Sequence, residues 1–329
     1  MTELPATGAP RAVVLGRVLA DMYPLQSGTP LEEVSTFERF VGGYGGNVAT
    51  GLARMGIRTA VVSGVGDDGH GRFITHALAA EGVDTTAIVV HPTLRTALAF
   101  AELWPPDHFP LLAYRFPSCP DQELTPEDLP RATLTTAPLA YVSGVAFAQR
   151  PSRDAAFAAL ELRVDSRVGT TILDLDWRPG YWLEPEGYPG LMARAVASAD
   201  VVIGSDGEFE AARLDPGSLV ASGSTQVLLK HGPAGASWLA SDGRHDEPGL
   251  PVPVVNGLGA GDAFAAAFGA GLLRGLPIPD LLRHANAAGA IVATRLACSA
   301  AMPTWDEVER MARDPQGWVR DLGIAGTTG

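Results

Sequence analysis

Apolar residues along the chain follow two alternating patterns, and together these predict the fold class. Short runs rich in Val, Ile and Leu indicate buried strands at 12–16, 59–63, 139–143, 170–174, 200–204 and 225–229. Between most of these runs apolar residues recur at helical spacing, as Val48, Leu52 and Met55 do before Gly56. Strands that alternate with helices predict one α/β domain over residues 1–329, with three layers: a mostly parallel sheet and helices on both of its faces.

Two regions depart from this alternation. Residues 21–41 and 93–118 contain strand patterns without partner helices. In the second region Leu112, Tyr114 and Phe116 fall on one side of a strand. We expect the two regions to form a small β-sheet that cannot bury itself alone. It would cover the carboxyl edge of the main sheet as a lid, or pack against a second subunit.

Composition and charge exclude several classes of protein. Of the 329 residues 46% are hydrophobic and 19% are charged, which is enough for a large core. The formal net charge of −13 argues against a nucleic-acid-binding surface. No apolar run approaches the roughly 20 residues of a membrane span, and no signal peptide is evident. The two cysteines provide no disulfide framework, so a cytoplasmic location is expected.

The glycine-rich segment Asn256–Asp262 is the most informative part of the sequence. It follows an extended run at 251–255, and Phe264 and Phe268 then recur at helical spacing. A glycine-rich turn that leads into a helix N-terminus directs free N–H groups at one point, which favours an anion site. Asp262 at its rim suits a reaction in which phosphate is held while a hydroxyl loses a proton. The alternative is an ordinary strand–helix junction capped by the aspartate.

The segment resembles the second signature of the PfkB, or ribokinase-like, family of carbohydrate kinases, usually written D-T-x-G-A-G-D. The final G-A-G-D is intact here. The resemblance implies a ribokinase-like fold. It also implies that Asp262 is the catalytic base and that the amides of Gly259, Ala260 and Gly261 form the anion hole for the transferred phosphoryl group.

A second string, G-G-Y-G-G-N at residues 42–47, resembles the first signature of the same family, G-G-x-x-x-N. The resemblance implies that Gly42 and Gly43 let a sugar approach the backbone and that Asn47 binds its hydroxyls. Asp21 occupies the place of the family's substrate-binding aspartate. The alternatives are a flexible hinge capped by Asn47 and an ordinary turn residue at position 21.

Two arginines are candidates for binding an anionic sugar. The string that ends the strand at 170–174 resembles the D-x-N-x-R-x-x-L-W of 2-keto-sugar-acid kinases and fructokinases, with Asp176 in place of Asn. Arg178 would then contact a substrate carboxylate or the phosphates as a bidentate fork. A surface salt bridge is the alternative for both residues. Arg115 is expected to project from the lid and to close over the sugar.

Further resemblances indicate the nucleotide side of the site. Glu208 is retained from the family's N-x-x-E motif, which tunes magnesium and phosphate binding, although it could equally serve as a first-turn partner of the helix dipole. Lys230, the only lysine, precedes a turn similar to the family's x-x-G-x-x-G, whose glycines here are Gly232 and Gly235. Asn286 matches a position near the adenine pocket. ATP and Mg²⁺ are therefore the implied cofactors.

A competing motif is present but lacks its context. Residues 64–69 match G-x-G-x-x-G after a strand, which is typical of dinucleotide-binding proteins. The acidic residue about 20 positions later, Asp84, precedes an extended run instead of ending one. We therefore reject an NAD site.

The resemblance, which spans nearly the whole chain, implies ATP-dependent phosphorylation of a sugar hydroxyl by a homodimer joined through the lid. Within the family several strings look most like the 5-dehydro-2-deoxygluconokinases of inositol catabolism, with 2-keto-3-deoxygluconate kinase and fructokinase as alternatives. A non-catalytic sugar- or nucleotide-sensing module is the alternative from another class. Ser205, Asn256 and Gly257 motivate it, because they depart from the family pattern near its magnesium and monovalent-cation sites. Activation by K⁺ is left open.

Overall fold

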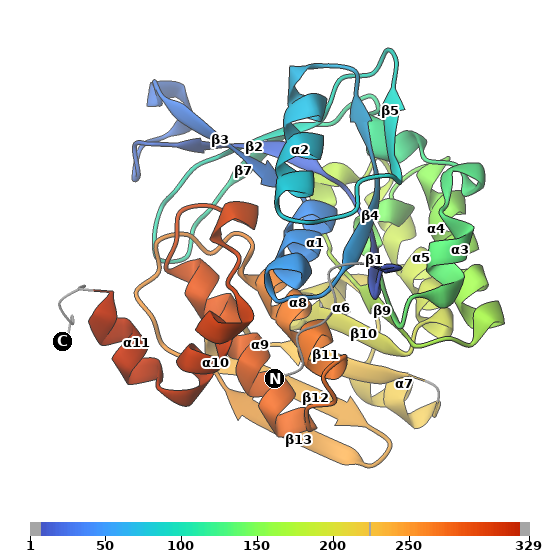
Figure 1. Ribbon diagram of the computed structural model, residues 1–329, viewed down its shortest axis with the longest axis vertical. Coiled ribbons are helices and arrows are strands. Elements are labelled where there is room, and N and C mark those ends of the chain that lie inside the picture. Colours follow the sequence, from blue (N-terminus) through green and yellow to red (C-terminus); the bar gives the residue numbers. More distant parts are fainter. Residues whose placement is uncertain (1–7, 224, 323–329) are drawn as a thin grey trace.

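The computed structural model describes residues 8–223 and 225–322. Within these residues, a nine-stranded sheet forms the centre of the molecule (Figure 1). Its parallel strands, in spatial order, are β5 (Ile88–His91), β4 (Thr59–Gly66), β1 (Ala12–Leu15), β8 (Leu139–Ser143), β9 (Thr170–Asp174), β10 (Val201–Ser205) and β11 (Gln226–Lys230). An antiparallel hairpin, β12 (Gly235–Ala240) and β13 (Gly243–Pro248), extends the β11 edge.

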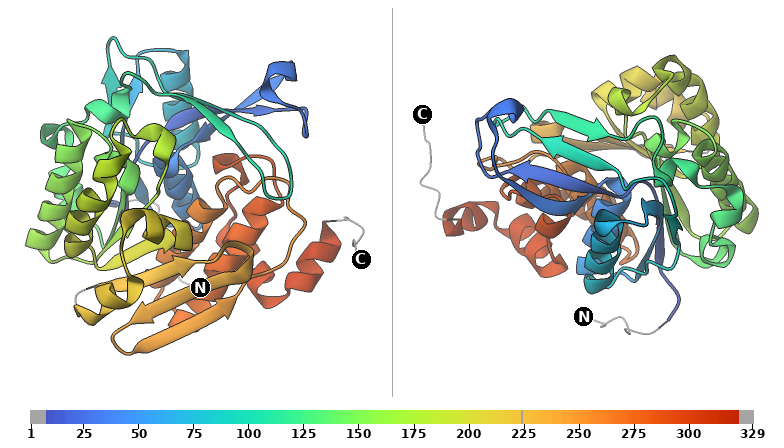
Figure 2. Two further views of the ribbon diagram at one scale, coloured as in Figure 1. Left: turned by 180° about the vertical axis from the view of Figure 1, so that it is seen from behind. Right: turned by 90° about the horizontal axis from the view of Figure 1, so that it is seen from above.

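Helices cover both faces of this sheet, as Figure 2 shows. One face packs against α1 (Tyr44–Arg54), α2 (Gly69–Ala80), α8 (Ala260–Leu272), α9 (Ile278–Ala293), α10 (Trp305–Arg313) and α11 (Pro315–Asp321). The other packs against α3 (Arg131–Thr136), α4 (Ser152–Ser166), α5 (Tyr188–Ala195), α6 (Asp206–Ala212) and α7 (Pro216–Ala221). Two apolar cores, one on each side of the sheet, result. The predicted three-layer α/β fold is confirmed.

The segment before the glycine-rich turn differs from the prediction. Residues 251–255 were expected to be extended, but they form no strand. Pro251 and Pro253 have no backbone N–H to donate to a sheet. The N–H groups of Val255 and Asn256 both donate to the carbonyl of Ala293 at the end of α9. The turn is therefore held by a neighbouring helix and not by the sheet.

The two irregular regions supply a second sheet, as expected. Its strands lie in the order β3 (Phe37–Gly42), β2 (Leu19–Pro24), β6 (Leu98–Ala101) and β7 (Leu111–Tyr114). The β2–β6 pair is parallel and the other pairs are antiparallel. This sheet, which we call the lid, projects from one side of the molecule (Figure 1). Only residues 16–18 join β1 to β2, so the carboxyl end of β1 leads directly into the lid.

No helix in the described part of the chain has both the length and the apolar character needed to cross a membrane.

Candidate active site

The N-terminus of α8 presents free backbone donors. Gly259 is the residue before the helix and has a φ of +82°, a left-handed conformation that favours glycine. The first amide bonded inside the helix is that of Ala263, which donates to the Gly259 carbonyl at 2.9 Å. Of the amides that precede it, that of Ala260 donates to the Gly257 carbonyl at 3.4 Å, whereas those of Gly261 and Asp262 have no partner among the described residues. With the helix dipole behind them, they can bind an anion.

The Asp262 side chain is held by the first turn of α1. Asn47 Nδ2 donates to Asp262 Oδ2 at 2.7 Å. Burial and the negative charge of Asp176 raise the pKa of Asp262, while the bond from Asn47 and the charge of Arg17 act in the opposite direction. Because α1 begins at Tyr44, Asn47 lies inside the helix and does not cap a hinge. The capped-hinge alternative is therefore wrong.

Asp21 lies on β2, opposite the end of β3. Its carboxylate is buried and accepts a bond from the Tyr23 hydroxyl at 3.3 Å. Burial raises the pKa of Asp21 to about 7, although the charge of Arg17 and the Tyr23 bond oppose this rise. A β-carbon on Gly42 would stand 2.0 Å from Asp21 Oδ2, so only glycine leaves room for the carboxylate there.

A pocket between the lid and the carboxyl edge of the main sheet brings these groups together. Its walls include Asp21, Asn47 and Asp262, together with Arg178 and the lid residue Leu111. Gly43 and Gly259 contribute backbone to the same walls. The sequence analysis did not identify several further lining residues, namely Arg17, Leu19, Tyr23, Tyr181, Leu258 and Cys298. Leu258 lies at the variable position of D-T-x-G-A-G-D, Tyr181 stands in place of the Leu of D-x-N-x-R-x-x-L-W, and the other four lie in no motif, so only the fold brings these residues to one place.

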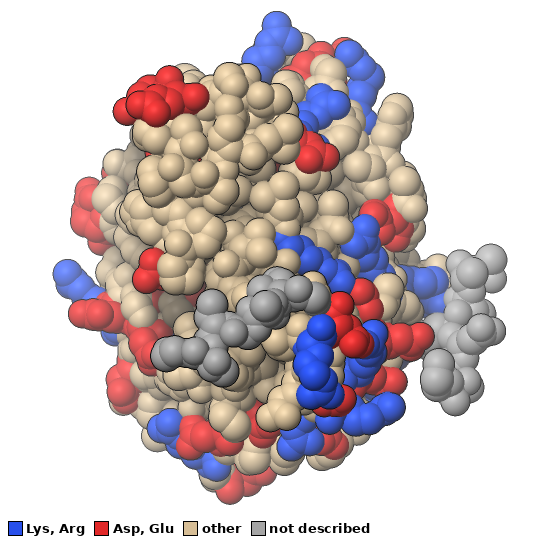
Figure 3. Space-filling view, turned by 90° about the vertical axis from the view of Figure 1, so that its left-hand side faces the viewer, with Lys and Arg blue, Asp and Glu red and all other residues tan. Residues whose placement is uncertain are grey.

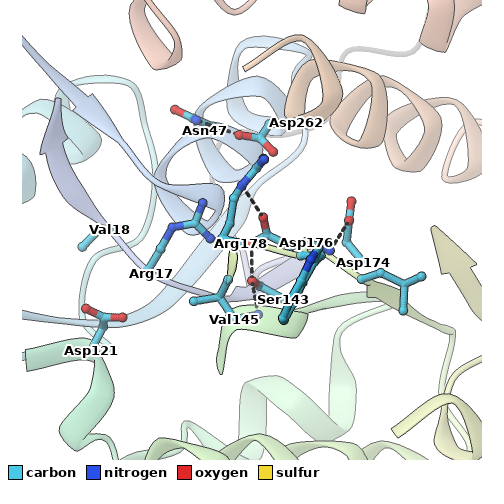
Figure 4. A network of polar contacts seen from close by, with 12 residues as sticks. Arg17, Val18, Asn47, Asp121, Ser143, Val145, Asp174, Asp176, Arg178 and Asp262 are labelled. Atoms are coloured by element: carbon cyan, nitrogen blue, oxygen red, sulfur yellow. Dashed lines mark hydrogen bonds and ion pairs between the residues drawn. The ribbon is translucent and has the colours of Figure 1, made fainter. Parts of the chain in front are cut away.

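Asp176 links two arginines at the base of this pocket (Figure 4). Its Oδ2 is paired with Arg17 Nη1 and accepts from the Ser143 hydroxyl at 2.7 Å, while Oδ1 lies 3.3 Å from Arg178 Nε. Burial tends to raise the pKa of Asp176, but the charges of Arg17 and Arg178 outweigh burial and lower it. The side chain of Asp176 is 3% exposed, so the surface salt bridge considered for it is wrong.

Arg115 was expected to project from the lid, and this placement is also wrong. Its guanidinium is buried and forms a two-pronged pair with Asp121, at 3.2 Å and 2.8 Å. It also stacks over the ring of Tyr181, 5.0 Å from the centroid. Arg115 follows the end of β7, where the chain turns back into the molecule, and it is not part of the pocket wall.

The predicted nucleotide-side residues meet at the carboxyl ends of β9, β10 and β11. Lys230 Nζ lies 3.5 Å from Asp174 Oδ2 and 3.6 Å from Glu208 Oε2. A β-carbon on Gly261 would be 3.7 Å from the same ammonium, so Lys230 also faces the start of α8. Burial raises the pKa of Asp174 to about 7; Lys230 opposes this and the charge of Glu208 adds to it.

Glu208 has the first-turn role considered for it, and the same carboxylate also faces the predicted nucleotide side. Its Oε2 accepts from the Ser205 amide at 2.7 Å and so caps α6, and Oε1 accepts from the Trp177 amide at 3.3 Å. The same carboxylate faces Lys230. Two carboxylates, those of Asp174 and Glu208, therefore surround one ammonium. This donor set suits Mg²⁺, which proteins usually bind through one or two carboxylates while nucleotide phosphates and water complete the shell.

The remaining predicted residues lie beyond Lys230. Gly232 and Gly235 have φ values of +58° and +112°, and a β-carbon on Gly235 would meet the Glu247 carbonyl at 2.1 Å. Asn286, on α9, donates to the carbonyls of Glu247 and Pro248 at 3.3 Å and 3.1 Å. It therefore holds the end of β13, and it does not line the pocket that contains Asp262.

Known proteins share this architecture and sequence. A protein from Geobacillus thermodenitrificans, described as 5-dehydro-2-deoxygluconokinase, is 34% identical over 311 residues, which cover 91% of this chain and 91% of its own. An uncharacterized sugar kinase from Pyrococcus horikoshii, solved in complex with ATP, has a TM-score of 0.79 and 26% identity, and the match covers 92% of this chain and 99% of that one. A double-mutant fructokinase from Vibrio cholerae O395, solved with fructose, ADP and potassium ion, gives the same four values.

The family model described as pfkB family carbohydrate kinase matches residues 9–305. The match includes the main sheet, the lid and every predicted site residue. This chain belongs to the pfkB family of carbohydrate kinases, and it is a phosphotransferase that acts on a sugar hydroxyl.

Proposed function

We propose that this protein transfers the terminal phosphoryl group of ATP to a hydroxyl of a sugar acid, with 5-dehydro-2-deoxy-D-gluconate as the substrate. The observation that carries the reaction type is the Asp262 carboxylate, which lies in the wall of a pocket at the start of α8, where the amides of Gly261 and Asp262 have no partner among the described residues. The relative that is 34% identical supports this choice of sugar, and Arg178 in the pocket wall gives a carboxylate something to bind.

The chemical roles follow from where each group lies. Asp262 accepts the hydroxyl proton and orients the oxygen towards phosphorus, while Asn47 fixes the carboxylate. The amides of Gly261 and its neighbours hold charge that develops on the transferred group. Lys230 lies against the same helix terminus and can contact the phosphates. Mg²⁺, held by Glu208 and Asp174 together with the nucleotide, would neutralise phosphate charge.

Sugar binding is assigned to the lid side of the pocket. Asp21 can accept two hydroxyls, and Gly42 and Gly43 keep the backbone beside it open. Arg178 is 46% exposed and, among the described residues, its guanidinium pairs with Asp176 through Nε alone. Its two terminal nitrogens are therefore free for an anionic ligand. On the nucleotide side we assign the turn with Gly232 and Gly235 to the phosphates.

Phosphoryl transfer to three sugars tests the proposal. We expect turnover with 5-dehydro-2-deoxy-D-gluconate to exceed that with 2-keto-3-deoxy-D-gluconate and D-fructose, as measured by ADP release. Asp262→Asn should keep ATP affinity near normal and lower kcat by about 10²-fold or more, because it removes the base while leaving the amides in place. If sugar and nucleotide bind without turnover in the unaltered protein, it is a sensing module.

We further propose that two copies associate through their lids. Large apolar side chains of the lid and the segment after it are exposed, namely Leu25, Leu111, Leu112, Tyr114 and Phe116. Figure 3 shows that much of the upper part of the lid side carries no charged side chain. Light scattering should give a dimer mass, and Leu112→Asp with Tyr114→Asp should give the monomer mass if this surface is the interface.

Dependence on potassium is expected to be weak. Asn256 stands where the family usually has an aspartate near its monovalent-cation site. Its amide donates to the Leu296 carbonyl at 2.6 Å and accepts from the Leu258 amide at 3.0 Å. The Asn256 side chain is neutral, and both its amide nitrogen and its amide oxygen are already hydrogen-bonded, so it is a poor ligand for a cation. The kcat in KCl and in NaCl should therefore be equal.

A further inference from the structure

Arg17 has no role in the reaction as described above, although it lies in the wall of the pocket. It belongs to the three-residue connection between β1 and β2, where the main sheet passes into the lid. Its side chain is 7% exposed. A guanidinium retains its charge in such a place, so burial without good partners is costly. The position of Arg17 therefore needs an explanation.

The hydrogen bonds of Arg17 are incomplete. A guanidinium has five N–H donors. In the described residues, Nη1 donates to Asp176, whereas Nε is buried without an acceptor and Nη2 makes no hydrogen bond. The face of the group lies over Tyr181, 5.1 Å from the ring centroid, which fixes its plane. A rigid, partly bonded guanidinium in a pocket wall has donors left for a ligand.

The pairing around Asp176 leaves a surplus of positive charge. One carboxylate is shared by Arg17 and Arg178, which gives these three groups a net charge of about +1. The Asp21 and Asp262 carboxylates of the same pocket also attract Arg17 but accept no hydrogen bond from it in the described residues. The Ser143 hydroxyl also binds the shared carboxylate, so Asp176 cannot turn away from the two guanidiniums. Asp176 itself has a φ of +36°, which is uncommon outside glycine, and so the backbone as well as the side chain is held.

A neutral sugar would not need this arrangement. Asp21 and Asn47, which line the pocket, can form hydrogen bonds with the hydroxyls of a sugar. A buried positive group next to them becomes useful when the ligand carries its own negative charge. The phosphates of the nucleotide have separate partners, because Lys230 and the first amides of α8 lie together. The hydrogen-bond acceptor that the Arg17 guanidinium lacks is therefore best supplied by a negatively charged group of the sugar.

We propose that Arg17 is a specificity-determining residue that binds the carboxylate of a sugar-acid substrate, and that Asp176 is the positioning residue that fixes Arg17 and Arg178 side by side. This inference rests on the proposed function and adds to it the residues that distinguish acidic from neutral sugars. In Figure 4 the two arginines flank Asp176, with Asp262 and Asn47 beyond Arg178.

The test compares an acidic with a neutral ligand in the whole protein. KM and kcat are measured for 5-dehydro-2-deoxy-D-gluconate, and D-fructose is titrated as a competitor, so that it needs only to bind. For Arg17→Lys, which retains the charge but not the fork, we expect KM for the acid to rise about 10- to 100-fold, the factor that a charge-assisted bond is worth. The kcat and the inhibition constant of D-fructose should change less than about threefold.

A second variant and a control distinguish a loss of substrate binding from a loss of folding. Arg17→Gln combined with Asp176→Asn removes the buried Arg17–Asp176 pair and leaves only the half-exposed Arg178 without its carboxylate, and it should show the same selective loss. Arg115→Lys is the matched control, because Arg115 is also buried, paired with an aspartate and stacked over Tyr181, but lies outside the pocket wall. It should lower the melting temperature without changing the ratio of acid KM to D-fructose inhibition constant.

Three outcomes would overturn the assignment. Equal losses for the acid and D-fructose would make Arg17 a structural residue. A fall in kcat at unchanged KM would place it at the transferred phosphoryl group. If the unaltered protein binds ATP but does not phosphorylate the acid, both the proposed function and the proposed role of Arg17 are wrong. This result can be told from the first two because it is seen in the unaltered protein, before any substitution is made.

Discussion

The Asp21 carboxylate occupies the space that a side chain on Gly42 would fill. Its Oδ2 lies 2.0 Å from the position of a β-carbon on Gly42, and Oδ1 lies 2.6 Å from it. The two residues are on paired strands, since β2 and β3 run antiparallel with Asp21 opposite Phe40. A glycine of the first family signature and the aspartate of β2 therefore form one structural unit, and the glycine determines where the carboxylate lies.

Gly42→Ala should consequently weaken sugar binding. The added methyl group must displace Asp21, so we expect KM for the sugar to rise at least tenfold and the free energy of unfolding to fall by about 1–3 kcal/mol, as overpacking usually does. Gly190→Ala, within α5, is the control, because no atom lies within 4 Å of its β-carbon position. That variant should be as stable as the parent or slightly more so. Equal KM values for the two variants would contradict this account.

The affinity for sugar should depend on pH through Asp21. Burial raises the pKa of this group to about 7, and only its ionised form can accept hydrogen bonds from two hydroxyls. Between pH 6 and pH 8 the ionised fraction rises about tenfold, so KM for the sugar should fall by up to about that factor. Asp21→Asn should bind weakly and show a flatter profile. Initial rates at saturating ATP give these values.

The same group should make stability fall as pH rises. The pKa of Asp21 is about 7 in the folded protein and about 3.8 when unperturbed, so between these values the folded chain keeps a proton that the unfolded chain has lost. Protonated Asp21 thus favours folding, and this contribution is lost as pH rises through 7. Urea unfolding at pH 5 and pH 8 should show a smaller decrease for Asp21→Asn than for the parent. Asp174, whose pKa burial also raises to about 7, contributes in the same direction in both proteins, so the difference between them reports Asp21.

The sequence predicted the residues of the reaction better than those of substrate choice, and the reason is physical. Asp262 and the amides before it lie on one short segment whose turn and helix start can be read locally. Arg17 and Tyr181 are far apart in sequence and meet only because β1 and the segment after β9 end at the same edge of the sheet. Arg115 shows the opposite kind of error. Its place next to an exposed strand predicted an exposed side chain, but the side chain is buried and paired with Asp121.

The hydrogen bond from Asn47 should set the acid limb of the pH–rate profile. This bond lowers the pKa of Asp262, which burial raises. Asn47→Ala removes the bond, so the pKa of Asp262 rises further and the acid limb of kcat moves to higher pH. Thr50→Val is a suitable control, because Thr50 is buried one turn later on α1 and its hydroxyl has no hydrogen-bond partner within residues 8–223 and 225–322. An unchanged profile in Asn47→Ala would show that Asp262 does not control the acid limb.

Lys230 should be needed for both stability and phosphoryl transfer, and a second substitution can separate the two. Its ammonium lies between Asp174 and Glu208, and the lysine and glutamate side chains are only 17% and 12% exposed. Lys230→Met leaves the two carboxylates uncompensated, which for a buried pair costs about 3–5 kcal/mol. Adding Glu208→Gln removes one of the two negative charges and should restore much of the melting temperature. It should not restore kcat, because the cation that faces the start of α8 is still missing. Glu208→Gln alone, which keeps Lys230, measures the share of the loss that comes from the proposed Mg²⁺ ligand. Recovery of turnover together with stability would mean that Lys230 serves the fold alone.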